Sequence, residues 1–263
     1  MIYFVVLAVS LLCSCVGFHM YIYFFSLGYG LAVAGLGVAY WVLFRSNMDA
    51  GAVALCTLLI VYGLRLSGYL LIREMRSRDY RKVLSPELER SAQMPLGAKY
   101  GLWLVCGLLY VLQTCPVFFR LYNGVPTGIL TWIGVAIMVV GLALETAADL
   151  QKTFAKRKNP RHYVSSGLYS FVRCPNYLGE MIFWVGVFLS GVAALRGAAQ
   201  WACAVLGLLL IFWIMFSGAR RLEIRQDRNY GEDPEYQKYC QSVPILLPFV
   251  PLYSVKRYKF LVA

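Results

Sequence analysis

Charged residues are scarce in this chain. They make up 14% of its 263 residues, whereas 60% are hydrophobic; a typical soluble domain is about a quarter charged. The hydrophobic residues form runs that approach the roughly 20 residues needed to cross a bilayer as a helix. The apolar–polar alternation of a membrane β-barrel is absent. The composition therefore predicts an all-α integral membrane protein and argues against a soluble enzyme.

Metal ligands and paired cysteines are also poorly represented. The chain has only two histidines, His19 and His162, and none of its eight cysteines forms a C-x-x-C pair. Most of the cysteines fall inside apolar runs, which favours buried or lipid-facing thiols. We therefore expect neither a metal site nor a disulfide framework.

No basic segment precedes the first apolar run, and no small-residue cleavage site follows it. We therefore expect this run to be a membrane span and not a cleaved signal peptide. Further apolar runs bring the expected number of transmembrane helices to seven, at about 2–18, 21–44, 50–72, 98–118, 128–149, 179–195 and 199–217.

Basic residues sort the loops into two classes. Of the 25 lysines and arginines, 21 lie in the segments 73–99, 152–173 and 220–259. Because basic loops stay in the cytoplasm, the N-terminus is expected outside and the C-terminus in the cytoplasm. The expected membrane is a bacterial inner membrane or the endoplasmic reticulum. Topogenic charge and attraction to anionic lipids account for the net charge of +12, so no nucleic-acid partner is inferred.

A stripe of charged residues begins with two acids within the fifth apolar run and continues with two lysines beyond it. Glu145, Asp149, Lys152 and Lys156 are spaced by four, three and four residues, which places them on one helix face. An ion-paired helix end is the ordinary explanation. It fits poorly here because the acids lie deeper than the bases, where each charge costs a few kcal/mol.

The segment "SGLYSFVRCPNYLGE" (166–180) places polar groups at the start of the next run. Gly167 and Pro175 favour irregular backbone, which membrane proteins tolerate where it lines a cavity. Asn176 and Glu180 are again four residues apart. Taken singly, the aromatic and basic residues fit an interfacial belt and topogenic charge. Together with the acidic stripe they predict a cytoplasm-facing pocket whose mixed charges suit a nucleotide, not an ion pathway.

The blocks "ADLQK", "GLYSFVRCPNYLGE", "GEDPEYQKY" and "VPILLPF" occur in the order found in a known family. Their pattern resembles the C-terminal domain of the steroid 5-alpha-reductase-like family, in the branch often named DUF1295. The resemblance implies a seven-helix membrane reductase that holds NADPH on its cytoplasmic side. It implies a single membrane domain, 1–263, with the lipid-substrate side in 1–127 and the cofactor region in 128–263.

The resemblance also implies site residues. Glu145 stands where the family has a cofactor-binding asparagine, and the full expected cofactor set is Glu145, Asp149, Lys156, Arg161, Tyr163, Tyr169, Arg173, Asn176, Tyr177, Glu180 and Arg220. The segment "YGLRLSGY" resembles the family's tyrosine-bearing segment, which makes Tyr62 the expected catalytic acid. In the steroid reductases that the sequence resembles, this tyrosine is paired with a glutamate. No such glutamate is found here, because the first two apolar runs contain no acidic residue. The substrate is therefore expected to be a sterol, polyprenol or enoyl lipid and not necessarily a 3-oxo-4-ene steroid.

Two alternatives stay open. Membrane methyltransferases of the isoprenylcysteine and phospholipid type share an R-H-P-x-Y segment and bind S-adenosylmethionine; here Cys174 replaces the histidine. A non-catalytic lipid-binding protein would explain the missing glutamate. The sequence does not predict an oligomeric state.

Overall fold

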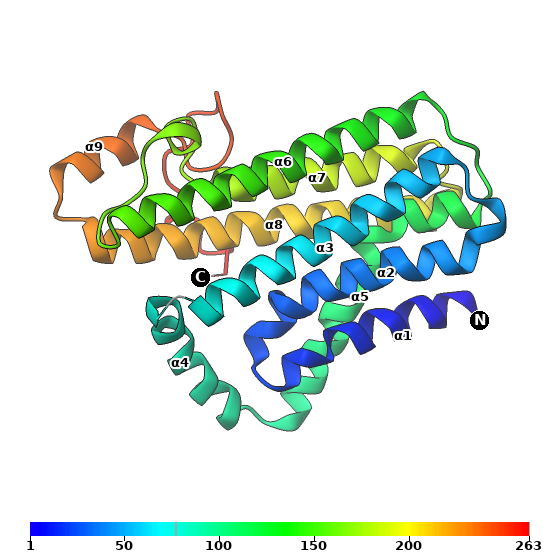
Figure 1. Cartoon of the computed structure of the whole chain (residues 1–263), viewed down its shortest axis with the longest axis horizontal. Coiled ribbons are helices and arrows are strands. Elements are labelled where there is room, and N and C mark those ends of the chain that lie inside the picture. The colour runs from blue at the N-terminus through cyan, green and yellow to red at the C-terminus, as the bar shows by residue number, and fades with distance from the viewer. Residues whose placement is uncertain (77, 263) are drawn as a thin grey trace. The chain divides into compact units, whose positions relative to one another are not determined.

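The computed structural model describes residues 1–76 and 78–262, and every regular element in them is helical (Figure 1). The α-helices, apart from short 3₁₀ turns, are α1 Ile2–Ser14, α2 Leu27–Phe44, α3 Ala50–Arg76, α4 Arg78–Gln93, α5 Leu96–Tyr122, α6 Ile129–Lys158, α7 Pro175–Val192, α8 Gly197–Tyr230 and α9 Pro234–Ser242. The predicted all-α class is confirmed.

Several helices are long and apolar enough to cross a membrane. Five qualify among the described residues: α3, α5, α6, α8 and, with the turn that follows it, α2. The segment Ile2–Phe18 is a shorter apolar helix, and the 18 residues of α7 include Asn176 and Glu180 near their start. The chain is therefore a multi-pass integral membrane protein. Seven spans, which also count α1 and α7, and the orientation remain predictions.

The second span begins later than its hydrophobicity predicts. Residues Tyr21–Phe25 form a 3₁₀ turn, and α2 starts at Leu27 instead of about residue 21. The polar groups of this turn are bonded to neighbouring helices: the Tyr21 amide donates to Ser91 Oγ (3.1 Å) and the Tyr23 hydroxyl to Glu74 (2.5 Å). Hydropathy counts these tyrosines as membrane residues, whereas their hydroxyls need polar partners.

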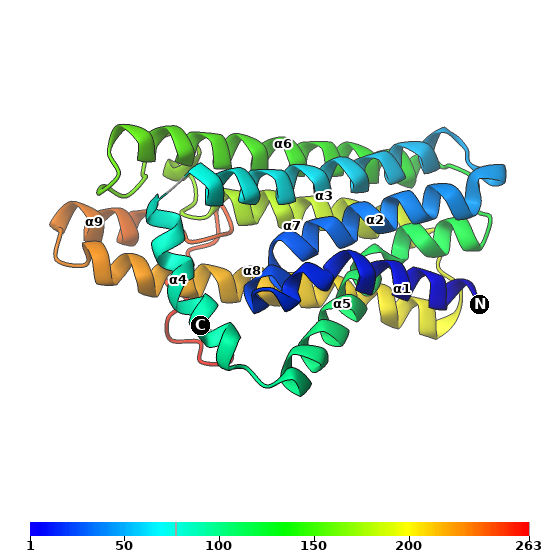
Figure 2. The same cartoon turned by 60° about the horizontal axis from the view of Figure 1, so that its bottom comes forward.

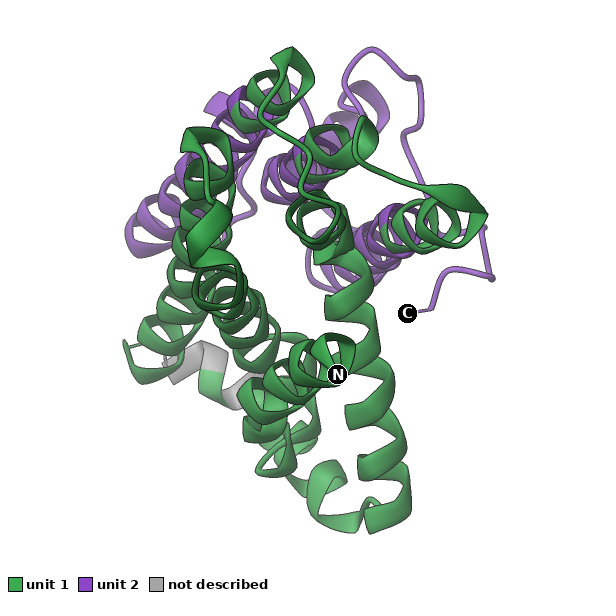
Figure 3. Ribbon diagram, turned by 90° about the vertical axis from the view of Figure 1, so that its right-hand side faces the viewer, with its two compact units in different colours: residues 1–135, 187–207 green, residues 136–186, 208–263 purple. Residues whose placement is uncertain are grey.

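The chain divides into two compact units (Figure 3). Unit 1 comprises residues 1–135 and 187–207, and unit 2 comprises residues 136–186 and 208–263. The division falls within α6, α7 and α8.

Unit 1 is built around a close contact between α2 and α3, which run side by side in both views (Figures 1 and 2). A Cβ atom at Gly63 would lie 2.6 Å from the Ala34 backbone nitrogen, and one at Gly30 would lie 2.6 Å from the Gly63 carbonyl oxygen. Small residues let helix backbones approach in a membrane, where van der Waals packing drives association. This contact fixes the buried neighbourhood of Tyr62.

Unit 2 contains a similar contact between α6 and α7. A Cβ atom at Gly179 would lie 2.6 Å from the Glu145 backbone nitrogen, and one at Gly141 would lie 2.7 Å from the Gly179 carbonyl oxygen. Elsewhere in the unit, α9 lies beside the last turns of α8 (Figures 1 and 2), and the Tyr236 hydroxyl donates to Asp227 (3.0 Å). The α6–α7 contact brings the acidic stripe against the start of α7.

Candidate functional site

Three carboxylates are buried where α6 meets α7. Glu145, Asp149 and Glu180 are only 3%, 5% and 6% exposed. The close approach of Gly179 to Glu145 holds the two helices together at this level. Buried carboxylates need polar partners, since an isolated buried charge is strongly unfavourable. The arrangement concentrates hydrogen-bond acceptors where these two helices meet.

Asn176, in the first turn of α7, supplies a further acceptor. Its Oδ1 is buried and has no hydrogen-bond partner among the described residues. An unsatisfied buried acceptor costs about 1–3 kcal/mol, so it suits a site that a ligand donor completes. The ring of its neighbour Tyr177 packs against α8, where a Cβ atom at Gly218 would lie 3.2 Å from the ring. The hydroxyls and amide of a nucleotide cofactor are donors of the kind that fits Asn176.

Arg173 has a side chain that is bonded within the protein. One terminal nitrogen donates to Glu223 (3.0 Å) and to the Tyr253 carbonyl, and the other donates to Cys240 Sγ (3.1 Å). The ion pair with Glu223 is almost fully buried. The second Glu223 oxygen accepts from the Val255 amide (3.0 Å). Arg173 thus joins the start of α7 to α8, α9 and the C-terminal segment, and a direct cofactor contact for it stays a prediction.

The proline-rich segment 243–253 supports the same region through its backbone. The amides of Arg173 and Cys174 donate to the carbonyls of Pro244 (2.9 Å) and Ile245 (3.0 Å). Burial raises the pKa of the Cys174 thiol to about 11. The thiol is therefore protonated at neutral pH and is not positioned as a reactive nucleophile. The segment is irregular, in agreement with its prolines.

The loop after α6 is closed by Lys156. Its ammonium donates to the carbonyls of Pro160 (3.1 Å) and His162 (2.7 Å) and to the Tyr230 hydroxyl (3.0 Å). Arg161, within this loop, is exposed. Of these two predicted cofactor residues, Lys156 is bonded to the loop and Arg161 is exposed to solvent.

Tyr163 belongs to an aromatic cluster. Its ring centre lies 5.1 Å from that of Tyr236 and 5.5 Å from that of Tyr239, with the second pair stacked. Burial raises the pKa of the Tyr163 phenol, and the carboxylates of Asp233 and Glu235 raise it further. The ring anchors the loop against α9 and stays protonated at neutral pH.

Gln151 explains part of the "ADLQK" block that sequence reasoning left without a role. Its side-chain nitrogen donates to the Ser166 carbonyl (2.9 Å) and its oxygen accepts from the Leu168 amide (3.0 Å). Between them, Gly167 has φ +61°, a conformation that glycine adopts without strain. Tyr169 then donates to the Ala148 carbonyl (3.3 Å) and accepts, through its own carbonyl, from Tyr239 (2.6 Å).

Arg220, the last predicted cofactor residue, bonds to the C-terminal segment. Its guanidinium donates to the carbonyls of Lys256 and Leu261, both at 3.1 Å. All eleven predicted cofactor residues thus lie in unit 2. Sequence reasoning missed Glu223, Asp227 and Tyr236, although two acids four residues apart in a basic helix end were a usable signal.

Tyr62, the predicted catalytic acid, lies in unit 1 and is fully buried. Its hydroxyl is 3.1 Å from that of Tyr29, and the Tyr29 ring centre is 5.2 Å from that of Tyr110. Arg65, one turn after Tyr62, lies 5.8 Å from the ring centre of Tyr69. Tyr29 was not predicted, and it gives Tyr62 a hydroxyl partner in place of the glutamate that the family resemblance led us to expect.

Comparison with known proteins defines the family. The family described as a protein of unknown function, DUF1295, matches residues 27–243. The chain therefore belongs to the DUF1295 family, as its sequence blocks predict. It is also similar to the very-long-chain enoyl-CoA reductase of Dictyostelium discoideum, with 28% identity over 131 residues. That match covers 45% of this chain and 36% of the relative. No solved structure matches the chain.

Proposed function

We propose that this protein is an NADPH-dependent membrane reductase that acts on a carbon–carbon double bond conjugated to a carbonyl in a lipid substrate. The named relative reduces an enoyl thioester, which favours an enoyl lipid over a sterol or polyprenol. The observation that carries the proposal is the Asn176 amide oxygen, which is buried and receives no hydrogen bond from the described residues, in a region with three buried carboxylates. Such acceptors suit the hydroxyls and carboxamide of a nicotinamide nucleotide.

Each part of unit 2 has a distinct role in this proposal. Asn176 accepts a hydrogen bond from the cofactor, and Glu145 and Asp149 accept from its ribose hydroxyls. The exposed Arg161 pairs with a phosphate, for which a guanidinium is well suited. Arg173, Lys156 and Tyr163 support the walls through the contacts described above.

NADPH, when bound, supplies the hydride. Tyr62 donates a hydrogen bond to the substrate carbonyl, which favours electron flow toward that oxygen as the double bond is reduced. Tyr29 orients the Tyr62 hydroxyl by donating a hydrogen bond to its oxygen across their 3.1 Å contact. The hydride would add to the β-carbon, and the α-carbon would then take up a proton from solvent. This tyrosine pair replaces the tyrosine–glutamate pair expected from the family resemblance.

Calorimetry on the full chain in detergent tests the cofactor. We expect saturable binding of NADPH, and about fivefold weaker binding in Asn176→Ala, since one hydrogen bond contributes about 1 kcal/mol. Asn47→Ala is the matched control, because Asn47 is exposed and lies in unit 1.

Titrations with NADH and S-adenosylmethionine distinguish the alternatives. Saturable binding of S-adenosylmethionine alone would identify a methyltransferase, and binding of none of the three would favour a non-catalytic lipid-binding protein. Unchanged NADPH affinity in Asn176→Ala, with the melting temperature also unchanged, would remove Asn176 from the site.

A further inference from the structure

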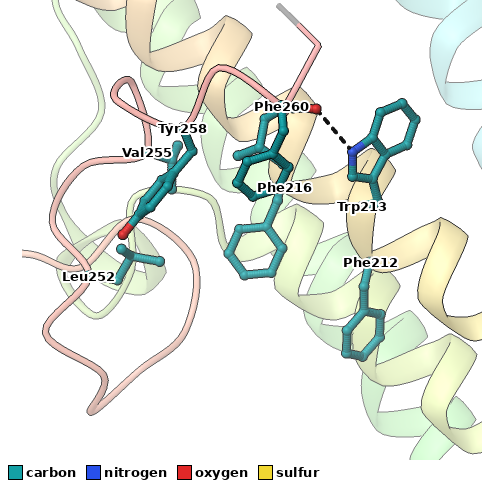
Figure 4. A pocket seen from close by; sticks show the side chains of 8 residues that line it. Phe212, Trp213, Phe216, Leu252, Val255, Tyr258 and Phe260 are labelled. Atoms are coloured by element: carbon teal, nitrogen blue, oxygen red, sulfur yellow. Dashed lines mark hydrogen bonds between the residues drawn. The ribbon is translucent and has the colours of Figure 1, made fainter.

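The C-terminal segment and α8 together form an apolar groove within unit 2 (Figure 4). The groove has a volume of about 340 Å³ and is lined almost wholly by carbon, from Phe212, Trp213, Phe216, Leu252, Val255, Tyr258, Phe260 and Leu261. An apolar cavity of about 150 Å³ is enough to bind benzene. This groove therefore has room for a stretch of hydrocarbon chain.

Specific hydrogen bonds build the groove. Trp213 Nε1 donates to the Phe260 carbonyl (3.3 Å), as the dashed line in Figure 4 shows. Arg220 holds the carbonyls of Lys256 and Leu261, and the Val255 amide donates to Glu223. The segment is thus fixed against α8 at several points, and the groove is a defined feature of unit 2.

The same segment exposes apolar side chains that are unfavourable in water. Phe249 is fully exposed, Phe260 is 69% exposed, and Tyr253 and Val262 are also exposed. Phe249 adopts φ +65°, a strained conformation for a bulky residue. Exposed aromatic residues next to bases are typical of segments that lie at the membrane–water interface.

Two bases at the groove are available for an anion. Lys256 is already paired with Asp227. Arg257 and Lys259 are exposed, and within the part of the chain that the structure describes neither is paired with a carboxylate. Arg257 donates to the hydroxyl of Tyr258 (2.7 Å), which itself lines the groove. Two bases thus flank Tyr258 in the chain, and one of them is bonded to the hydroxyl of this groove residue.

We propose that this groove binds an anionic glycerophospholipid. One acyl chain lies along Phe212, Trp213 and Phe216, and the phosphate is held by Arg257, Lys259 and the Tyr258 hydroxyl. The lipid is the occupant because the groove belongs to a multi-pass membrane protein. It combines apolar space of hydrocarbon size with two nearby bases that form no ion pair within the described residues. The proposal is independent of the reductase function, since the phosphate ligands named here are not among the predicted cofactor residues.

Quenching of Trp213 by brominated lipids tests the site. The full chain is reconstituted in phosphatidylcholine bilayers that contain increasing fractions of brominated phosphatidylglycerol or, in parallel, brominated phosphatidylcholine. The chain has six tryptophans, so the signal of Trp213 is taken as the difference between the wild type and Trp213→Phe. We expect half-quenching at an about 25-fold lower fraction of phosphatidylglycerol than of phosphatidylcholine, because each of the two bases contributes about fivefold.

Charge variants assign the preference to the two bases. Arg257→Gln/Lys259→Gln should lose most of it, at about fivefold per base removed. Arg157→Gln/Lys158→Gln removes the same charge elsewhere in unit 2 and should keep it. Lys259→Gln alone, with an expected fivefold loss, replaces the double variant if that fails to fold.

Three outcomes would overturn the proposal. Equal quenching by the two lipids would show that the groove faces bulk lipid without a phosphate site. Absence of Trp213 quenching by either lipid would show that a protein segment or a second copy covers the groove. Equal loss of preference in the control variant would show a general effect of net charge.

Discussion

At the scale of single residues, the Arg173–Glu223 pair is the central support of unit 2. Both side chains are almost completely buried, and their contacts reach α7, α8, α9 and the C-terminal segment. A buried pair of this kind is a weak source of net stability when intact, whereas the loss of one partner is costly. The pair therefore makes the shape of the candidate site depend on a residue fifty positions away along the chain.

Glu223→Gln should destabilise the protein by about 3–5 kcal/mol, because it leaves the Arg173 guanidinium buried without a counter-charge. Denaturant unfolding in detergent, followed by circular dichroism, measures the change. Arg90→Gln is the control, since the Arg90 side chain is 69% exposed in its pair with Glu87 and the pair should contribute less than about 1 kcal/mol. Equal unfolding midpoints for Glu223→Gln and the wild type would contradict a supporting role for the pair.

The eleven cofactor residues predicted from the sequence all lie in unit 2, whereas the predicted catalytic residue Tyr62 lies in unit 1. The partners that hold these side chains were not predicted. Spacing predicts that Glu145 and Asp149 share one face of α6 and that Asn176 and Glu180 share one face of α7, since helical periodicity is local. The role of Arg173 depends on Glu223 and on the Tyr253 carbonyl. Such contacts between distant segments leave no periodic signal in one sequence.

At the scale of elements, close contacts at glycine residues hold pairs of helices together within each unit. The hydrophobic runs predicted the helices well, because a membrane span needs a long apolar stretch. The runs could not show where an apolar aromatic stretch leaves the helix, as at Tyr21–Phe25, or that α6 and α8 continue to Lys158 and Tyr230. Helix ends beyond the membrane depend on tertiary partners and not on hydropathy.

Two glycines of α3 provide a matched test of the α2–α3 contact. Gly63→Ala should destabilise by about 1–3 kcal/mol, because the added methyl group would meet the backbone of α2 at van der Waals overlap. Gly68→Ala places a methyl group in open space and should be neutral or stabilising by up to about 1 kcal/mol through helix propensity.

Thermal unfolding of both variants in one detergent gives the comparison. Tyr62 is next to Gly63 in α3, so its surroundings depend on the α2–α3 contact. Only Gly63→Ala should therefore also alter the near-ultraviolet circular dichroism. Similar melting temperatures for the two alanine variants would show that α2 and α3 do not approach as described.

At the scale of the whole molecule, the number of spans decides which side of the membrane each terminus occupies. Seven spans place the two ends on opposite sides, whereas six or eight place them together. The concentration of bases in 73–99, 152–173 and 220–259 favours seven.

Paired reporters fused to the N-terminus and C-terminus should therefore report opposite sides, with the C-terminus in the cytoplasm. A third reporter inserted at Gly124, which has open space around it, should report the same side as the N-terminus. Termini on the same side would show that α1 or α7 does not cross the bilayer.

Helix α8 has 34 residues, which at 1.5 Å per residue span about 51 Å. The hydrocarbon core of a bilayer is only about 30 Å thick. Roughly 20 Å of this helix therefore extends beyond the hydrocarbon core. Part of α6, which has 30 residues, extends beyond it as well. The end of α8 that carries Glu223 and Asp227, and that leads into α9, is continuous with the membrane-spanning part of the same helix. The distance of these helix ends from the lipid is set by the helical rise. A thinner or thicker bilayer would therefore change which residues of α6 and α8 lie at the membrane surface, without changing the structure of the helix ends.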